Sequence, residues 1–251
     1  MKVFVATPTA GGLVKIEYTS TLMTVVKALT TLQAQWRYLN FDGADVVMAR
    51  NFLTNVFLQD ETCTHLLFID SDMGVSYETV NRFLTADLPF LGAIYPKRSL
   101  NLATFYDGAQ GGRSLEQSLA LAQDFNVLLD PGQLDIKNGL CKVKALGFGF
   151  VLIQRWVFEA LITQKIVQPL ISGTLKTVGL TGDLYDFFSL IQLPQGDWLS
   201  EDYAFCDRAA TLDGVDIWGW AGAGVSHIGS FAYGASYLDH LRAKNPPSTP
   251  A

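Results

Sequence analysis

The first hundred residues alternate between short apolar runs and amphipathic stretches, and this alternation limits the fold more than any other feature. The runs "KVFVA", "WRYLNF", "HLLFI" and "PFLGAIY" have the length and apolar content of buried strands. Apolar residues recur at helical spacing between them, over residues 18–35, 46–59 and 77–84. Strands joined by helices of this length pair in parallel through right-handed crossovers. We therefore expect an α/β fold on a mostly parallel sheet.

Composition is that of an ordered, soluble protein. Of 251 residues, 49% are hydrophobic and 17% are charged, which is typical of a chain with a sizeable core. The net charge of −6 argues against nucleic-acid binding, which requires basic surface. No apolar run approaches the length of a transmembrane span, and residues 1–12 resemble a strand rather than a signal peptide. Three scattered cysteines indicate reduced, packed thiols, so we expect a cytoplasmic location.

The rest of the chain is less regular. The segment "KVKALGFGFVLIQ" predicts a strand with a Gly-x-Gly kink, followed by a helix over residues 155–165. Another helix is predicted from residue 200, one short helix near residues 115–123, and two late strands in "VDIWGW" and "GVSHIG". We find neither a repeat nor a linker. The sequence therefore predicts one domain over residues 1–240 and a Pro-rich tail over residues 241–251.

Three polar segments follow predicted strands directly. They are "TPTAGG", "DSDMG" and "YPKR". In an open α/β sheet, ligands bind beyond the carboxyl ends of the strands, where these segments meet. This edge of the sheet is the first indication of a functional site.

Asp70 and Asp72 end the third predicted strand and point to the same side, because side chains alternate along a strand. Two neighbouring carboxylates repel each other unless a positive charge lies between them. A divalent cation with oxygen ligands, Mg²⁺ or Mn²⁺, is the usual solution. The alternative is structural: Asp72 caps the next helix and Asp70 pairs with a lysine.

"LLFIDSDM" resembles the Asp-x-Asp signature of the GT-A nucleotide-sugar glycosyltransferases, and further landmarks of that family follow in order. They are "VATPT" (5–9), "ARN" (49–51), "LGFGFVLIQRWVFE" (146–159), "SEDYAFCDRA" (200–209) and "SHIGSFAY" (226–233). The resemblance spans residues 3–233 and is greatest to small family-2-like enzymes of phages, large viruses and bacteria. The chain departs from them in Ala235 and a short tail. The resemblance implies a single-domain GT-A fold, in which helices flank a Rossmann-like sheet. It also implies a nucleotide-binding half (1–98) and an acceptor half (99–240) with a smaller antiparallel region.

The resemblance also implies a metal site. Asp72 would ligate Mn²⁺ or Mg²⁺ directly, Asp70 would bind it through water or hold the ribose, and His227 would complete the site. Taken alone, a histidine between apolar neighbours is more often a hydrogen-bonded core residue. The metal would bridge the two phosphates of a nucleoside-diphosphate sugar, with UDP-sugars favoured over GDP-sugars.

Glu201 and Asp202 are the expected catalytic acids. An acceptor hydroxyl loses a proton as it attacks the anomeric carbon, so a positioned carboxylate is required. By resemblance Asp202 is the base of an inverting transfer and Glu201 contacts the acceptor, although swapped roles stay open. Acids in a first helical turn are also favoured by the helix dipole without any function.

Donor contacts are expected from the strand ends. By resemblance, they come from Thr7, Pro8, Thr9, Arg50, Ser71 and Lys97. Pro8 and Thr9 would hold the nucleobase. Arg50 either contacts the nucleotide or pairs with a surface acid, and Lys97 and Arg98 either reach the diphosphate or are solvated.

Other enzymes with a similar sheet fit less well. A dinucleotide-dependent oxidoreductase requires Gly-x-Gly-x-x-Gly after the first strand, where this chain has "TPTAGG". A phosphatase would place its Asp-x-Asp after the first strand, and a sugar nucleotidyltransferase would place a basic Gly-rich loop there. A non-catalytic nucleotide-sugar binding module and a retaining glycosyltransferase stay open as alternatives.

Overall fold

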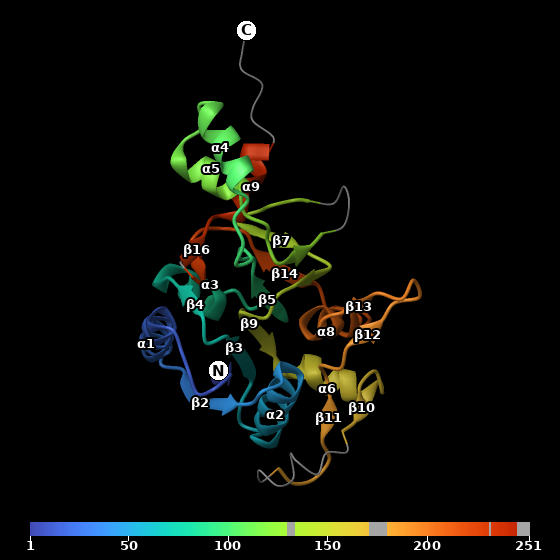
Figure 1. Cartoon of the computed structure of the whole chain (residues 1–251). Helices are drawn as coiled ribbons and strands as arrows, with labels where there is room; N and C mark the ends of the chain where they lie inside the picture. The colour runs from blue at the N-terminus through green and yellow to red at the C-terminus, as the bar shows by residue number, and fades with distance from the viewer. Residues whose placement is uncertain (130–133, 171–179, 231, 245–251) are drawn as a thin grey trace.

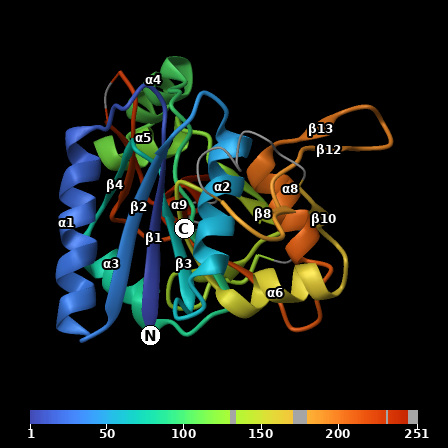
Figure 2. The same cartoon turned by 90° about the horizontal axis from the view of Figure 1, so that it is seen from below.

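Helices cover both faces of a seven-stranded sheet in the computed structural model, which describes residues 1–129, 134–170, 180–230 and 232–244 (Figures 1 and 2). The strand order is β2-β1-β3-β9-β5-β14-β7. Five strands run in one direction, and β9 and β7 run against them. The predicted α/β fold with a mainly parallel sheet is confirmed. The strands are β1 (Lys2–Thr9), β2 (Gln35–Asp42), β3 (His65–Ile69), β5 (Phe90–Ala93), β7 (Leu140–Lys142), β9 (Phe150–Gln154) and β14 (Ile217–Trp220).

The position of β9 differs from the expectation for the acceptor half. This strand lies in the centre of the main sheet, antiparallel to both β3 and β5. Its segment "FVLI" is buried throughout, as is typical of a strand covered on both faces. The chain therefore leaves the sheet after β5 and returns to fill the gap between β3 and β5.

The flanking helices begin within two residues of the predicted positions. On α2, the Asp45 side chain accepts a hydrogen bond from the Val47 amide at 2.9 Å, which caps the helix. The predicted helix over 18–35 is shorter, because Gln33 takes a left-handed φ of 53° and β2 begins at Gln35. The helices are α1 (Ile16–Thr31) and α3 (Tyr77–Thr85) on one face, and α2 (Val46–Gln59), α6 (Arg155–Thr163) and α8 (Glu201–Ala209) on the other.

A cluster of phenylalanines fixes α8 against the sheet. Phe205 of α8 stacks on Phe188 with ring centroids 5.0 Å apart and meets Phe148 at 5.3 Å and Phe90 at 5.8 Å. All four side chains are fully buried. Large buried aromatic rings contribute several kilocalories per mole each to a core, so the first turn of α8 has a fixed place.

Two asparagines of α2 bind a segment of the acceptor half. The Asn55 side chain donates to the carbonyl of Tyr185 and accepts from its amide, both at 2.9 Å, as a neighbouring strand would. One turn earlier, Asn51 accepts from the Phe187 amide at 2.8 Å and donates to Asp186 at 2.8 Å. The segment around β11 (Tyr185–Asp186) is therefore attached to α2, and β11 pairs with β10 (Gln168–Pro169).

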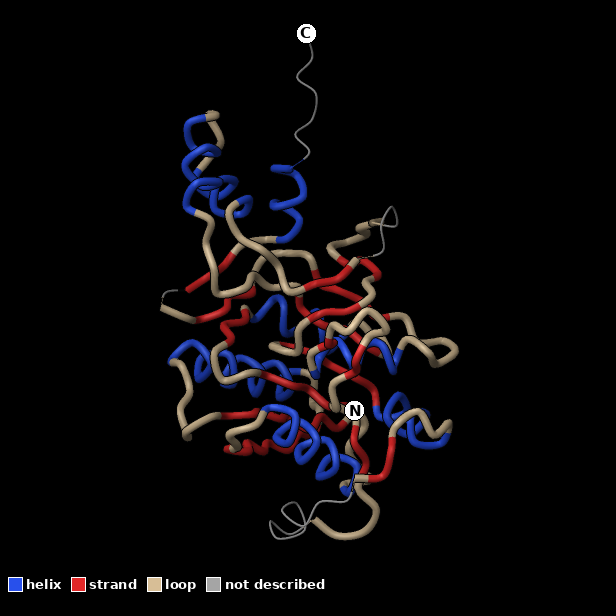
Figure 3. Tube along the Cα trace, turned by 45° about the vertical axis from the view of Figure 1, so that its right-hand side comes forward, coloured by secondary structure: helices blue, strands red, loops and turns tan. Residues whose placement is uncertain are grey.

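Three helices form a cap at one end of the molecule (Figures 1 and 3). They are α4 (Leu102–Gln110), α5 (Leu115–Leu121) and α9 (Tyr237–Lys244), of which the sequence predicted only α5. Helix α9 continues to Lys244, four residues past the predicted end of the domain; residues 245–251 of the predicted tail lie outside the described residues. The small antiparallel sheets are formed by β4 (Met73–Val75), β15 (Val225–Ile228) and β16 (Ala232–Gly234), by β6 (Val127–Leu128) and β8 (Ala145–Leu146), and by β12 (Ile191–Gln192) and β13 (Trp198–Leu199).

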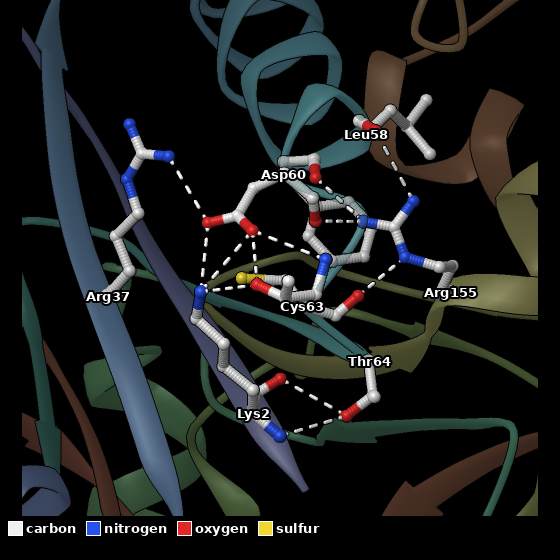
Figure 4. A network of polar contacts seen from close by, with 9 residues as sticks. Lys2, Arg37, Leu58, Asp60, Cys63, Thr64 and Arg155 are labelled. Carbon is white, nitrogen blue, oxygen red and sulfur yellow. Dashed lines mark hydrogen bonds and ion pairs between the residues drawn. The ribbon is translucent and has the colours of Figure 1, made fainter.

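Arg155 closes the carboxyl-terminal end of α2 (Figure 4). Its guanidinium donates to the carbonyls of Phe57 at 2.8 Å and Asp60 at 2.6 Å, and lies 4.5 Å over the Phe57 ring. A cation at this end also suits the helix dipole. The opposite end of α2 contributes Val46 and Ala49 to the pocket described below.

Two expectations from composition can be compared with the structure. Cys63, Cys141 and Cys206 are free and buried, as predicted. Within the described ranges, no helix combines the length and apolar content needed to cross a bilayer.

Candidate functional site

A pocket of about 290 Å³ lies at the carboxyl ends of β1, β2 and β3. The structure brings five of the predicted residues into its lining: Pro8, Thr9, Asp70, Ser71 and Asp72. The loop after β2 and the start of α2 complete the lining together with Arg98. The position agrees with the rule that ligands bind beyond the carboxyl ends of strands.

Three predicted donor residues lie outside the lining: Thr7, Lys97 and Arg50, of which Arg50 is described below. The Thr7 side chain is buried below the pocket, where its hydroxyl bonds to the hydroxyl of Tyr18 at 2.7 Å. Lys97 is exposed and outside the lining, while the next residue, Arg98, is part of it. The cation at this position of the pocket is therefore Arg98 rather than the predicted Lys97.

Asp70 is bound by Arg50. Both carboxylate oxygens of Asp70 accept from Arg50 Nη2, at 3.0 and 3.1 Å. Burial, together with the nearby Asp72 and Glu201 carboxylates, raises the pKa of Asp70, although Arg50 opposes the shift. The positive charge around Asp70 is therefore too small to outweigh burial and the two neighbouring carboxylates.

Arg50 joins the sheet to α8. It is only 2% exposed, and its Nε lies 3.4 Å from Glu201 Oε1. Burial works against the charge, but Asp70, Glu201 and Asp202 outweigh it and raise the pKa of Arg50. Its Nη1 has no hydrogen-bond partner among the described residues. Of the two roles left open by the sequence, the geometry shows pairing with acids, and these acids are in the interior.

Asp72 meets His227 across the β4–β15 pair. Met73 and His227 are opposite each other in this pair, and the Ile228 amide donates to the Asp72 carbonyl at 2.8 Å. Asp72 Oδ2 lies 3.3 Å from His227 Nε2 and 3.0 Å from Arg98 Nη1. Although burial works in the other direction, these two neighbours lower the pKa of Asp72.

The ring of His227 is oriented by a backbone carbonyl. Its Nδ1 lies 3.1 Å from the Pro96 oxygen, and only a protonated Nδ1 can donate to a carbonyl. The other ring nitrogen, Nε2, faces Asp72. A backbone carbonyl on the second nitrogen is the usual way in which a metal-binding histidine is oriented.

These side chains allow a test of the predicted metal site. Within the part of the chain that the structure describes, no three His, Cys, Asp or Glu side chains lie close enough to hold a metal together. Asp70 is turned to Arg50, so the three predicted ligands are not assembled. Asp72 and His227 still offer an oxygen and a nitrogen donor side by side. Mg²⁺ and similar ions are commonly held by one or two carboxylates plus phosphate oxygens and water, and Asp72 supplies one such carboxylate beside the His227 nitrogen.

The two predicted acids open α8. Asp202 is 8% exposed, and its Oδ1 accepts from the Tyr203 amide at 2.8 Å and from the Ser200 hydroxyl. Glu201 faces Arg50 instead. The two acids therefore have different surroundings: one is held by hydrogen bonds within the helix start, and the other is paired with a cation shared with Asp70.

Sequence reasoning missed Tyr95, which lies among these groups. Its hydroxyl accepts from the Gly149 amide at 3.1 Å, and its ring meets the His227 ring edge-on at 5.2 Å. Burial, with Asp70 and Asp202 nearby, raises the pKa of Tyr95. The sequence feature that could have indicated Tyr95 is the Gly-x-Gly just before β9. A Cβ at Gly147 or Gly149 would collide with this tyrosine, so the two glycines leave room for its side chain.

The charges of the site do not balance. Four carboxylates (Asp70, Asp72, Glu201 and Asp202) face two guanidinium groups (Arg50 and Arg98), which leaves two negative charges when His227 is neutral. Buried or half-buried charges need compensation. A divalent cation, or a ligand that brings one, would supply it.

No family profile and no curated protein match the chain in sequence. Among solved structures, A197 from STIV is similar at 15% identity with a TM-score of 0.47, over 91% of this chain and 86% of that protein. A glycosyltransferase involved in the glycosylation of the major capsid of PBCV-1 gives 10% identity and a TM-score of 0.32, over 66% and 65%. A nucleoside-diphosphate-sugar pyrophosphorylase from Vibrio cholerae RC9 gives 10% and 0.37, over 95% and 80%. We base the function on the side chains described above.

Proposed function

We propose that this protein is a metal-dependent glycosyltransferase that moves a sugar from a nucleoside diphosphate to an acceptor hydroxyl with inversion. One observation carries the proposal. The pocket at the strand ends has the Asp72–His227 pair at its edge and is connected through Asp70 and Arg50 to Glu201, the first of the two acids that open α8. A donor pocket, a cation site and a base on a separate element are the three parts that such a transfer needs.

The donor nucleotide would occupy the pocket. Pro8, Thr9 and the loop after β2 would surround the base, and Ser71 would lie near the ribose. A volume of about 290 Å³ is at the lower end for ligand pockets. Asp72 and His227 would hold Mn²⁺ or Mg²⁺, whose charge would stabilise the departing diphosphate.

Asp202 would be the base. It lies on α8, on a different element from the proposed metal ligands, and would approach the sugar from the side opposite the leaving group. It would take the proton of the acceptor hydroxyl as the new bond to the anomeric carbon forms. Glu201 would contact the acceptor, and exchanged roles of the two acids would leave the same stereochemistry.

The acceptor would approach along a hairpin. Strands β12 and β13 project from the body just before Ser200 (Figures 1 and 2). Trp198 on this hairpin is 60% exposed, which is unusual for a tryptophan. An exposed indole four residues before the proposed base offers a flat apolar surface to a sugar acceptor.

Calorimetry tests the proposal. UDP, GDP and their sugars are titrated with and without Mn²⁺ into the wild type and into His227→Ala. We expect Mn²⁺-dependent binding in the wild type, and weaker Mn²⁺ binding in His227→Ala with an unchanged melting temperature of the metal-free protein. If His227 is a core residue instead, the metal-free variant loses stability and keeps its metal affinity. If no nucleotide binds, the proposed function is wrong.

Two further measurements distinguish the alternatives. Release of UDP from a UDP-sugar separates an enzyme from a non-catalytic binding module, which would bind the donor and leave it intact. The anomeric proton coupling of the product separates inversion from retention, because one displacement turns an α-linked donor into a β-linked product.

A further inference from the structure

Arg98 and a metal ion at the proposed site would require the same oxygen. Arg98 Nη1 is 3.0 Å from Asp72 Oδ2, and His227 Nε2 approaches that oxygen at 3.3 Å. An ion held by Asp72 and His227 would lie between these atoms. A guanidinium and a divalent cation on one carboxylate oxygen repel each other, so they exclude one another.

The place of Arg98 is built into the fold. Its aliphatic stem crosses Gly229, two residues after His227, where an added Cβ would come within 3.0 Å of Arg98 Cδ. The backbone ahead of it is fixed, because the Lys97 amide donates to the Asp124 carbonyl at 2.7 Å. The guanidinium end nevertheless stays accessible, with 53% of the side chain exposed. Packing against Gly229 therefore fixes the direction of the aliphatic stem, and the guanidinium of Arg98 can move within the pocket that Arg98 lines.

We propose that Arg98 is an exchangeable counter-ion of the site, a conclusion that rests on the proposed function. In the ligand-free protein Arg98 neutralises Asp72. When a divalent cation and a nucleoside diphosphate bind, Arg98 leaves Asp72 and pairs with the diphosphate oxygens. An arginine fork fits phosphate oxygens well, so Arg98 has an anionic partner both before and after the exchange.

This exchange predicts opposite effects of one substitution. Removing the charge in Arg98→Met frees Asp72, so Mn²⁺ alone should bind about two- to five-fold more tightly, the range that an exposed ion pair is worth. The same variant lacks the phosphate contact, so UDP in saturating Mn²⁺ should bind about ten-fold or more weakly. Lys97→Met is the matched control, because Lys97 is an exposed neighbouring cation outside the pocket.

Isothermal titration of Mn²⁺ alone, and then of UDP in saturating Mn²⁺, measures both effects. Opposite shifts in Arg98→Met, with neither shift in Lys97→Met, support the exchange. An unchanged or weaker Mn²⁺ affinity in Arg98→Met, or unchanged UDP affinity, overturns it while the proposed function stands. A wild type that binds neither Mn²⁺ nor UDP overturns the proposed function, and this inference with it.

Discussion

Two clusters of charge lie at opposite ends of α2, and they are built differently. At the far end, Asp60 has Lys2 at 3.1 Å and Arg37 at 3.3 Å (Figure 4). The Thr62 hydroxyl, with Lys2 and Arg37, holds the pKa of Asp60 well below its usual range. We call these four residues the Asp60 cluster. It has more positive than negative charge.

At the sheet edge the balance is reversed. Asp70 has an arginine as close as those around Asp60, yet its pKa is raised because burial and two neighbouring carboxylates outweigh the pairing. A charge cluster whose role is only to stabilise the fold contributes most when each charge is paired with an opposite charge. A cluster that is short of positive charge gives up stability and keeps affinity for a cation. The difference between the two ends of one helix is the physical reason to place function at the sheet edge.

The largest expected effect concerns the acids of α8. Asp202→Asn should lower the release of UDP from a UDP-sugar by roughly 10²–10⁴, the usual worth of a positioned general base. Nucleotide affinity measured by calorimetry should stay the same, because Asp202 contacts neither Asp72 nor His227 in this structure. Near wild-type turnover of Asp202→Asn would remove Asp202 from the mechanism.

The second prediction sets the two clusters against each other. Asp72→Ala should weaken Mn²⁺-dependent UDP binding at least about a hundred-fold, because even the partners behind a metal ligand are worth 10–100-fold. Its metal-free melting temperature should fall less than that of Asp60→Ala, since the loss of Asp72 also relieves its repulsion with Asp70. Asp60→Ala should do the opposite: a lower melting temperature and unchanged UDP binding. The same response from both variants would show that the clusters do not differ as proposed.

The third prediction concerns the end of α2. Arg155→Leu leaves the carbonyls of Phe57 and Asp60 without their donor and should cost about 2–3 kcal/mol in the free energy of unfolding. Urea unfolding measures this loss. Exposed Arg242, which pairs with Asp239 three residues earlier, provides a matched control, and Arg242→Leu should stay within about 0.5 kcal/mol of wild type.

The sequence predicted the local elements better than their arrangement. Periodicity predicted both the first and the last residue of α2, because the apolar face of the helix and its Asp45 cap are local features. The place of β9 depends on pairing with β3, more than eighty residues away, which no local pattern contains. Helix α4 was missed because nearly all its residues are exposed or half-buried, so no apolar stripe marks it.

The site shows the same limit. Resemblance proposed Asp70, Asp72, Glu201 and Asp202 as site residues, and the structure joins Asp70 and Glu201 through Arg50 and pairs Asp72 with Arg98. The contact of Arg50 with Glu201 spans 151 residues and could not be inferred from spacing. Whether Lys97 or Arg98 enters the pocket depends on the direction of the backbone after β5, which the sequence leaves open.

The last prediction uses pH to separate the clusters. The folded pKa of Asp60 is below its ordinary value of 3.8, so the unfolded chain takes up a proton that the folded protein does not. The stability from the Asp60 cluster is therefore fully present above about pH 5 and is lost as pH falls through 3.8 toward the folded pKa. Asp60→Asn removes this contribution, so its free energy of unfolding by urea should fall less than that of wild type between pH 5 and pH 3.

Asp70→Asn should show the opposite change: its free energy of unfolding should fall more than that of wild type over the same pH range. The reason is that the pKa of Asp70 is raised, so its protonation favours the folded state in acid. Equal acid slopes in wild type and Asp60→Asn would mean that Asp60 is not held by its neighbours in solution, and the contrast between the two ends of α2 would lose its basis.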